Sequence, residues 1–415
     1  MDGRTQLGGI DKERLWADLM TLGAIGGTAA GGSMRGALSS ADREGRALFA
    51  HWAREAGLAL RVDRIGNMFA RREGRNPQAA PVVIGSHLDT QLPGGKFDGP
   101  LGVLAGLAVC RALDAAGTVT ARPIEVVNWT NEEGARFQPG VMGSAVYTGA
   151  LDLTQALSRT DPTGASVEGE LARIGAAGTT PVPGAVPHSY FELHIEQGPE
   201  LEEAGLDIAM VTRSSAMCSG YATIRGENGH TQTLAMSKRR NALTAAAKLV
   251  LAIDAIGASI EPHGTVSASV IENWPNNRVN IPHLSKLSWA IVGFDPAIRE
   301  ATVARIEAAC AGIATETGLV IELDHRHYRE PCLFDEALIG KGLAAAATRG
   351  YAATRMPTLT AHDALSFCAL CPTALVFVPC RGGISHSEAE WCSPDQAAKG
   401  ADILLDLVQE AAESE

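Results

Sequence analysis

The chain has 415 residues, 46% of them hydrophobic, and a formal net charge of −12. This length exceeds what one ordinary hydrophobic core serves, so two domains are expected. The acidic balance argues against a nucleic-acid partner, which would require a basic face. The short basic triplet at residues 238–240 is interpreted as a solvated helix face.

No targeting or membrane signal is visible. Residues 1–20 contain no apolar stretch like that of a secretory signal, and no apolar run reaches the roughly 18 residues of a membrane span. Eight cysteines in a chain of this length do not form a disulfide framework, and the pair Cys368 and Cys371 is interpreted as buried thiols. A reduced, cytoplasmic protein without a membrane partner is expected.

The first predicted elements form a strand–helix–strand unit. A helix is expected over residues 39–58, followed by strands within 81–87 and 122–133 that flank a helix over 101–117. This order is typical of a parallel or mixed sheet, in which ligands bind beyond the carboxyl ends of the strands. His87 and the pair Glu132–Glu133 would lie at those ends.

The later part of the chain indicates a second domain. Residues 151–187, rich in Pro, Gly and small side chains, are interpreted as an excursion between elements. Residues 213–328 have their own expected elements and form a predicted α+β insert, with strands within 219–226, 264–273 and 286–294 and helices over 241–257 and 298–318. The predicted catalytic domain therefore comprises 1–212 and 329–415. Its last helix begins at Ser393-Pro394.

Five positions carry possible metal ligands. His87, His194 and His386 each follow a strand-like run and precede a turn, and Asp98 and the Glu132–Glu133 pair complete the set. Imidazole and carboxylate ligands suit zinc, manganese, cobalt or nickel. Of two adjacent glutamates, one can bind metal while the other serves as general base. Alternatively, such histidines are structural and such glutamates lie on the surface, and spacing alone leaves both interpretations open.

Six motifs resemble the dimetal amidohydrolases of the hydantoinase/carbamoylase type, which include N-carbamoyl-L-amino acid hydrolases, allantoate amidohydrolases and β-ureidopropionases. They are GSHLDTQLPGGKFDGPLGVLAGL, NWTNEEGARF, HIEQGPELE, GHTQTLAMSKRRNAL, AHDA and GISHS. The resemblance implies an α/β fold: a dimetal exopeptidase-like catalytic domain, with a mixed sheet flanked by helices, plus an inserted α+β lid/dimerisation domain. It also implies a homodimer that acts on a small molecule.

The resemblance assigns roles to individual residues. It implies two divalent metal ions (Zn, Mn, Co or Ni) per subunit, one bound by His87, Asp98 and His194 and the other by Asp98, Glu133 and His386. Glu132 would be the general base, Asp89 would orient the imidazole of His87, and His230 would stabilise the oxyanion of the reaction.

The insert departs from the family pattern. Val279 stands where an Asn is expected, and Val292 stands where an Arg usually clamps the substrate carboxylate. Arg213 and Ser215 replace the usual Gly and Gln upstream. The substrate is therefore expected to lack the usual α-carboxylate, or to have its acid held elsewhere, with Arg213 and Arg278 as candidates. The other predicted substrate contacts are Gln197, Asn280 and His362.

The predicted function is the hydrolysis of a non-peptide C–N bond, in an amide, ureido or acylamino compound, by metal-bound hydroxide with Glu132 as base. An aminoacylase or dipeptidase with the same metal centre is the nearest alternative. A homologue that binds metal or ligand without catalysis is the alternative of another class.

Overall fold

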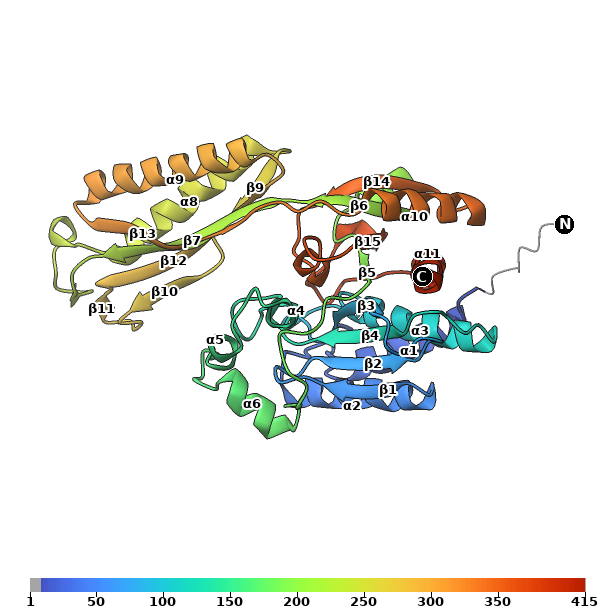
Figure 1. Ribbon diagram of the computed structural model, residues 1–415. Coiled ribbons are helices and arrows are strands. Elements are labelled where there is room, and N and C mark those ends of the chain that lie inside the picture. The colour runs from blue at the N-terminus through green and yellow to red at the C-terminus, as the bar shows by residue number, and fades with distance from the viewer. Residues whose placement is uncertain (1–8, 415) are drawn as a thin grey trace. The chain divides into compact units, whose positions relative to one another are not determined.

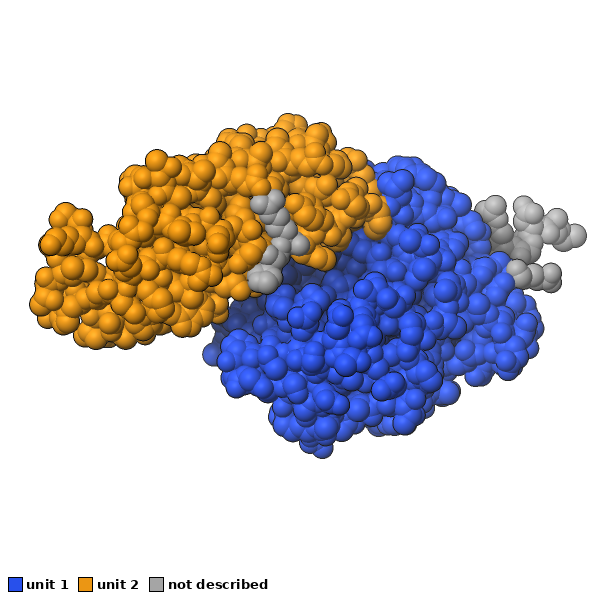
Figure 2. Space-filling view, turned by 60° about the vertical axis from the view of Figure 1, so that its left-hand side comes forward, with its two compact units in different colours: residues 1–212, 333–356, 361–415 blue, residues 213–332, 357–360 orange. Residues whose placement is uncertain are grey.

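The computed structural model describes residues 9–414. The first eight residues, part of the segment without an apolar stretch, lie outside that range. Unit 1 comprises the chain up to Thr212, Leu333–Met356 and the chain from Ala361 onward, and unit 2 comprises Arg213–Cys332 and Pro357–Thr360 (Figure 2). Unit 2 thus includes a short segment beyond the predicted insert, and the roles of the two parts remain predictions.

Unit 1 is built on an eight-stranded mixed sheet in the order β1-β2-β4-β3-β5-β15-β6-β14 (Figure 1). Its strands are β1 (Ala59–Val62), β2 (Met68–Arg72), β3 (Val82–His87), β4 (Ile124–Trp129), β5 (Ser189–Ile195), β6 (Ile208–Ser214), β14 (Ala353–Thr358) and β15 (Thr373–Val378). The neighbours β4, β3, β5 and β15 run parallel to one another. Their carboxyl ends therefore meet at one edge of the sheet.

The helices of unit 1 surround this sheet. They are α1 (Lys12–Ala24), α2 (Ser40–Glu55), α3 (Pro100–Ala115), α4 (Met142–Thr148), α5 (Leu153–Leu157), α6 (Val167–Ile174), α7 (Glu200–Ala204), α10 (Glu336–Arg349) and α11 (Pro394–Glu413), with 3-10 turns η2 (Asp363–Ser366) and η3 (Arg381–Gly383). The strand–helix–strand prediction is confirmed by β3, α3 and β4. The helices α3 and α11 pack against the central strands, and α11 begins with a capping box formed by Ser393 and Gln396.

Unit 2 has a five-stranded antiparallel sheet with the path β10-β12-β7-β13, and β9 also pairs with β12. Its elements are β7 (Ala216–Arg225), β8 (Gly229–His230), η1 (Met236–Lys238), α8 (Ala242–Ile260), β9 (Gly264–Ser267), β10 (Ile271–Trp274), β11 (Asn280–Ile281), β12 (Leu284–Gly293), α9 (Pro296–Thr317) and β13 (Val320–Arg329). The run expected as one strand over 264–273 is two strands, β9 and β10. Figure 1 shows α8 and α9 side by side on one face of this sheet.

Among the described residues, only the helix α8 is long and apolar enough to cross a membrane. Lys248 and Asp254 interrupt its apolar sequence. Leu249, Ile253 and Ile256 are buried in the core of unit 2, together with side chains of α9 and the sheet. Packing within unit 2 accounts for this buried stripe of α8, whereas Leu243 and Leu251 are exposed.

Candidate metal centre

The predicted ligands converge at the carboxyl edge of the parallel strands. His87 is the last residue of β3, and His194 lies near the end of β5, which pairs with β3 in parallel. Glu132 and Glu133 follow β4, the parallel neighbour on the other side of β3. Each strand therefore delivers its polar residue to the same place, as the sequence pattern predicted.

Asp98 stands at the centre of this arrangement. Its Oδ1 lies 3.5 Å from His87 Nε2 and 3.1 Å from His194 Nε2, whereas its Oδ2 lies 3.4 Å from His386 Nε2. The potential ligand atoms form two groups, each within 4.8 Å: His87, Asp98 and His194, and Asp98, Glu133 and His386. These are the two predicted ligand sets, and Asp98 belongs to both.

Backbone carbonyl groups orient two of the imidazoles. His87 Nδ1 donates to the carbonyl oxygen of Asp89 at 2.8 Å, and His194 Nδ1 donates to that of Ile195 at 2.9 Å. A carbonyl oxygen only accepts, so the proton of each neutral ring lies on Nδ1. The lone pair on Nε2 is then directed towards Asp98, which is the tautomer that a metal ligand needs.

Asp89 contacts His87 through its main chain and not through its carboxylate. Its carboxylate lies 4.0 Å from His87 Nδ1, too far for a hydrogen bond. Instead it accepts hydrogen bonds from the backbone N–H groups of Glu132 and Glu133, both at 3.3 Å. Asp89 therefore orients His87 through its main chain and holds the two glutamates through its side chain.

The two adjacent glutamates have different surroundings. Glu133 Oε2 lies 3.2 Å from His386 Nε2 and accepts a hydrogen bond from Gln91 Nε2 at 2.7 Å. Glu132 Oε2 lies 3.4 Å from His87 Nε2 but belongs to neither ligand group. Glu133 is therefore placed as a metal ligand, whereas Glu132 remains available as a general base.

Burial and charge shift the acidity of these groups. Burial lowers the pKa of His87, but Glu132 and Asp98 outweigh it and hold that pKa well above the ordinary value. Burial and the nearby Asp98 raise the pKa of Glu133 to about 7. Burial also raises the pKa of Glu132 well above its usual range. Without a bound cation, burial therefore favours the protonated form of both glutamates.

The buried carboxyl groups around the centre show whether divalent cations fit there. Six carboxyl groups are buried around the centre: Asp89, Asp98, Glu132, Glu192, Asp363 and Glu390. Buried carboxylates are stable only when they are paired or coordinate a cation. Oδ2 of Asp363 and Oε2 of Glu390 have no hydrogen-bond partner among the described residues. The donor set, nitrogen and oxygen without thiolate, suits zinc, manganese, cobalt or nickel.

The other predicted residues of unit 1 lie beside this centre. Gln197, predicted to contact substrate, donates from Nε2 to Asp98 Oδ2 at 2.6 Å. The buried ring of His362 packs edge-on against His194, with centroids 4.6 Å apart. Both residues thus adjoin the ligands.

Unit 2 carries the remaining predicted residues. His230 on β8 pairs in register with Asn280 on β11, and His230 Nδ1 accepts a hydrogen bond from Gln232 N at 3.1 Å. The proton of the neutral ring of His230 is therefore on Nε2. Arg278 is exposed in the same region. Arg213, also exposed, lies over the ring of Phe294, 5.4 Å from its centroid.

Sequence reasoning missed Glu390. Its Oε1 accepts hydrogen bonds from the backbone N–H groups of Phe97 and Asp98, at 2.8 and 3.1 Å. Burial and the charge of Asp98 raise the pKa of Glu390 to about 7. The only signal was an acid four residues after His386, a pattern that surface segments share.

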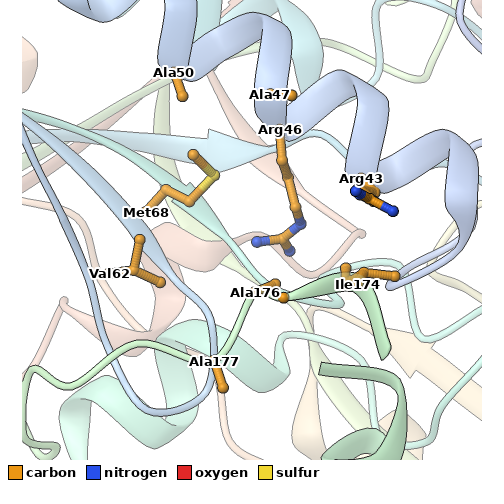
Figure 3. A pocket seen from close by; sticks show the side chains of 10 residues that line it. Arg43, Arg46, Ala47, Ala50, Val62, Met68, Ile174, Ala176 and Ala177 are labelled. Atoms are coloured by element: carbon orange, nitrogen blue, oxygen red, sulfur yellow. The ribbon is translucent and has the colours of Figure 1, made fainter. Parts of the chain in front are cut away.

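A cavity of unit 1 lies away from these residues and has a different character. It lies beside α2 and the end of α6, where Figure 3 shows Arg46 pointing between Met68 and Ala176. The guanidinium of Arg46 is engaged by Asp42 and by the carbonyl oxygen of Gly66. No acid or histidine lines this cavity, so the carboxyl edge of the sheet is the candidate site.

Comparisons with known proteins agree with this geometry. The family model for peptidase family M20/M25/M40 matches residues 83–410. The chain belongs to this family. An N-carbamoyl-L-amino-acid amidohydrolase from Rhizobium meliloti is 40% identical over 404 residues, or 97% of each chain.

Solved structures show that the likeness covers the whole chain. An amidase of the hydantoinase/carbamoylase family from Burkholderia vietnamiensis is 40% identical, with a TM-score of 0.95 over 100% of both chains. A structure of AtUAH in complex with glyoxylate is 27% identical, with a TM-score of 0.90 over 98% of each chain. The predicted resemblance is confirmed, and the chain is an amidohydrolase of the M20 family.

Proposed function

We propose that this M20 amidohydrolase cleaves a carbamoyl or ureido C–N bond in a small molecule with the help of two divalent ions. The observation that carries the proposal is the pair of ligand groups that share Asp98, with Glu132 beside them. The names of relatives support the substrate class, since they include N-carbamoyl-L-amino-acid amidohydrolase and ureidoglycolate hydrolase.

The ligand assignment follows the two groups. His87 and His194 would hold one ion and Glu133 and His386 the other, and Asp98 belongs to both ligand groups. Zinc, manganese, cobalt and nickel all suit these donors. Such ions polarise a carbonyl group and lower the pKa of the attacking water. His386 is half-exposed, which leaves this side of the centre open to solvent.

Glu132 moves the proton in the proposed reaction. Its carboxylate accepts a proton from water as the water oxygen bonds to the carbonyl carbon. The same carboxyl group then donates that proton to the nitrogen as the C–N bond breaks. His230 donates from Nε2–H to the oxyanion that forms on the carbonyl oxygen.

The substrate contacts of unit 2 are atypical for N-carbamoyl-amino-acid hydrolases, because Val279 and Val292 replace polar residues. Either the substrate lacks an α-carboxylate, or another residue binds it. We further propose a cytoplasmic homodimer that assembles through unit 2. None of the eight cysteines forms a disulfide bond, as suits a reducing compartment.

An activity screen tests the function. Metal-loaded protein is assayed against N-carbamoyl amino acids, other ureido compounds, N-acyl amino acids and dipeptides. We expect the carbamoyl and ureido compounds to be cleaved fastest. Glu132→Gln should retain both ions, measured by elemental analysis, and lose about 10²- to 10⁴-fold in kcat.

Each other outcome points to a specific alternative. Faster cleavage of N-acyl amino acids or dipeptides would assign the chain to the aminoacylases or dipeptidases. Bound metal without any hydrolysis would favour a homologue that has lost catalysis. A Glu132→Gln variant that keeps the wild-type rate would refute the role of this residue as base.

A further inference from the structure

Unit 2 contains a partly buried arginine that has no acidic partner among the described residues. Arg329, the last residue of β13, donates from Nη2 to Ser215 Oγ at 3.2 Å, and its Nε is buried without a hydrogen-bond partner. Burial lowers the pKa of Arg329, and no carboxylate of the described residues forms an ion pair with it. The neighbouring Glu330 pairs instead with Arg299, at 3.0 Å.

A β-bulge determines which face of the sheet Arg329 occupies. The register between β13 and β7 shifts between Asp324 and His327, so that Arg329 lies opposite Met217. Residues directly opposite on neighbouring strands project to the same face. Without the extra residue, simple alternation from Asp324 would turn Arg329 to the other face.

Arg329 shares this face with position 292. Val292 on β12 also lies opposite Met217, so Val292 and Arg329 flank Met217 at the same level of the sheet. The next residues along β7 and β12, Cys218 and Ile291, point to the other face and are buried in the core with α8 and α9. Figure 1 shows α8 and α9 on one face of this sheet. By its register Arg329 belongs to the opposite face.

Ser215 fixes the position of the guanidinium group. Its hydroxyl donates to the carbonyl oxygen of Leu359 at 2.8 Å and accepts from Arg329 Nη2. The serine proton is thus committed to a carbonyl group, which leaves an oxygen lone pair for the arginine. One edge of the guanidinium is held, and Nε lacks the acceptor that a buried donor requires.

We propose that Arg329 is the carboxylate-binding residue of this chain and that the compound it hydrolyses carries a carboxylate. A planar guanidinium offers parallel N–H donors that match the two oxygens of a carboxylate, and such a pair also satisfies the orphaned Nε. The inference rests on the proposed function and selects its second alternative, an acid held elsewhere. Arg213 and Arg278 are exposed, so neither has the same unmet need for an anion.

Paired substrates test this assignment. Wild type and Arg329→Leu, both loaded with metal, are assayed with N-carbamoyl amino acids and with the corresponding neutral amides. We expect Arg329→Leu to raise KM for the acids about 10- to 100-fold, with kcat nearly unchanged. The kcat/KM for the amides should stay within about twofold of the wild-type value.

Two further variants distinguish the loss of a specific carboxylate contact from a general disturbance of the structure of unit 2. Arg329→Lys, which keeps the charge but loses the fork, should show an intermediate KM for the acids. Arg225→Leu serves as control, because Arg225 is an exposed arginine of the same sheet that pairs with Glu322. It should leave all rates unchanged. Equal losses on acids and amides in Arg329→Leu would overturn the proposal, as would an unchanged KM for the acids.

Direct binding separates this inference from the proposed function. N-carbamoyl amino acids are titrated by calorimetry into Glu132→Gln protein, with and without Arg329→Leu. Binding that weakens with the second substitution supports the carboxylate contact, even if the wild type proves inactive on ureido compounds. Equal affinity in both proteins, or no binding in either, overturns it.

Discussion

His87 Nδ1 donates a hydrogen bond to the main-chain carbonyl oxygen of Asp89, while the carboxylate of Asp89 accepts hydrogen bonds from the backbone N–H groups of Glu132 and Glu133. One residue thus positions both a candidate ligand and the candidate base, by separate groups. The two functions can be separated by mutation, because a side-chain substitution leaves the carbonyl in place.

Asp89→Asn should affect turnover more than metal binding. The amide nitrogen of Asn cannot accept a hydrogen bond, so one of the N–H groups of Glu132 and Glu133 loses its acceptor. We expect kcat to fall about 10- to 100-fold, while metal affinity stays close to that of the wild type. Kinetics and metal titration measure the two effects. A collapse of metal affinity in Asp89→Asn would show that the carboxylate itself orients His87.

Gly99→Ala should damage the centre by steric contact. Gly99 has φ +82, and a Cβ atom there would lie 2.3 Å from His87 Cε1. We expect reduced metal content and a free energy of unfolding lowered by about 1–3 kcal/mol. Gly117→Ala is the matched control, since Gly117 has φ +65 and no atom within 4 Å of such a Cβ. It should cost about 1 kcal/mol and leave metal content intact. Equal effects of the two substitutions would contradict the steric explanation.

Metal affinity should increase with pH. In the protein without ions, the acids Asp98 and Glu133 outweigh burial and raise the pKa of His386 to about 9. The pKa of Glu133 is about 7. A cation must displace these protons, so its affinity should rise between about pH 6 and 9, and binding should release protons. Calorimetry in buffers of different ionisation enthalpy counts them. His386→Ala should release fewer protons, and an unchanged count would refute this source.

Asp161 should contribute to stability in acid. A hydrogen bond from Thr163 and the pairing with Arg136 lower the pKa of Asp161 to about 2, from an ordinary value of 3.8. A carboxyl group with a lowered pKa stabilises the folded state above its unfolded pKa, and that contribution is lost as pH falls. Asp161→Asn should therefore be less stable at neutral pH and show a flatter loss between about pH 4 and 2. Urea unfolding measures this, with the exposed Glu168→Gln as control.

The central part of the site was predictable because regular structure places it. His87, His194 and the glutamate pair follow apolar runs, and parallel strands bring such ends together. Glu390 was not predictable, because its contact with the N–H of Asp98 depends on the path of two loops far apart in sequence. Nor was the left-handed backbone of Gln197 and His386, with φ 62 and 52, since neither residue type indicates it.

The fold of unit 2 was also easier to predict than its chemistry. Alternating burial along β12 matches its sequence pattern, so the strand was visible before the structure. Arg329 was overlooked because the bulge after Asp324 reverses the faces of β13. An inserted residue of this kind leaves no mark in the sequence, yet it decides whether the last side chain of the strand faces the hydrophobic core or the opposite side of the sheet.

The order of the ligands along the chain has a consequence for biosynthesis. Unit 2 separates the ligands along the chain: it follows Asp98, Glu133 and His194 and precedes His386. Ribosomes therefore synthesise the first ligands well before the last one. The complete cation site arises only after the whole intervening unit has been synthesised. The group of His87, Asp98 and His194 is therefore complete before unit 2 is synthesised, and the group that needs His386 is complete only after it.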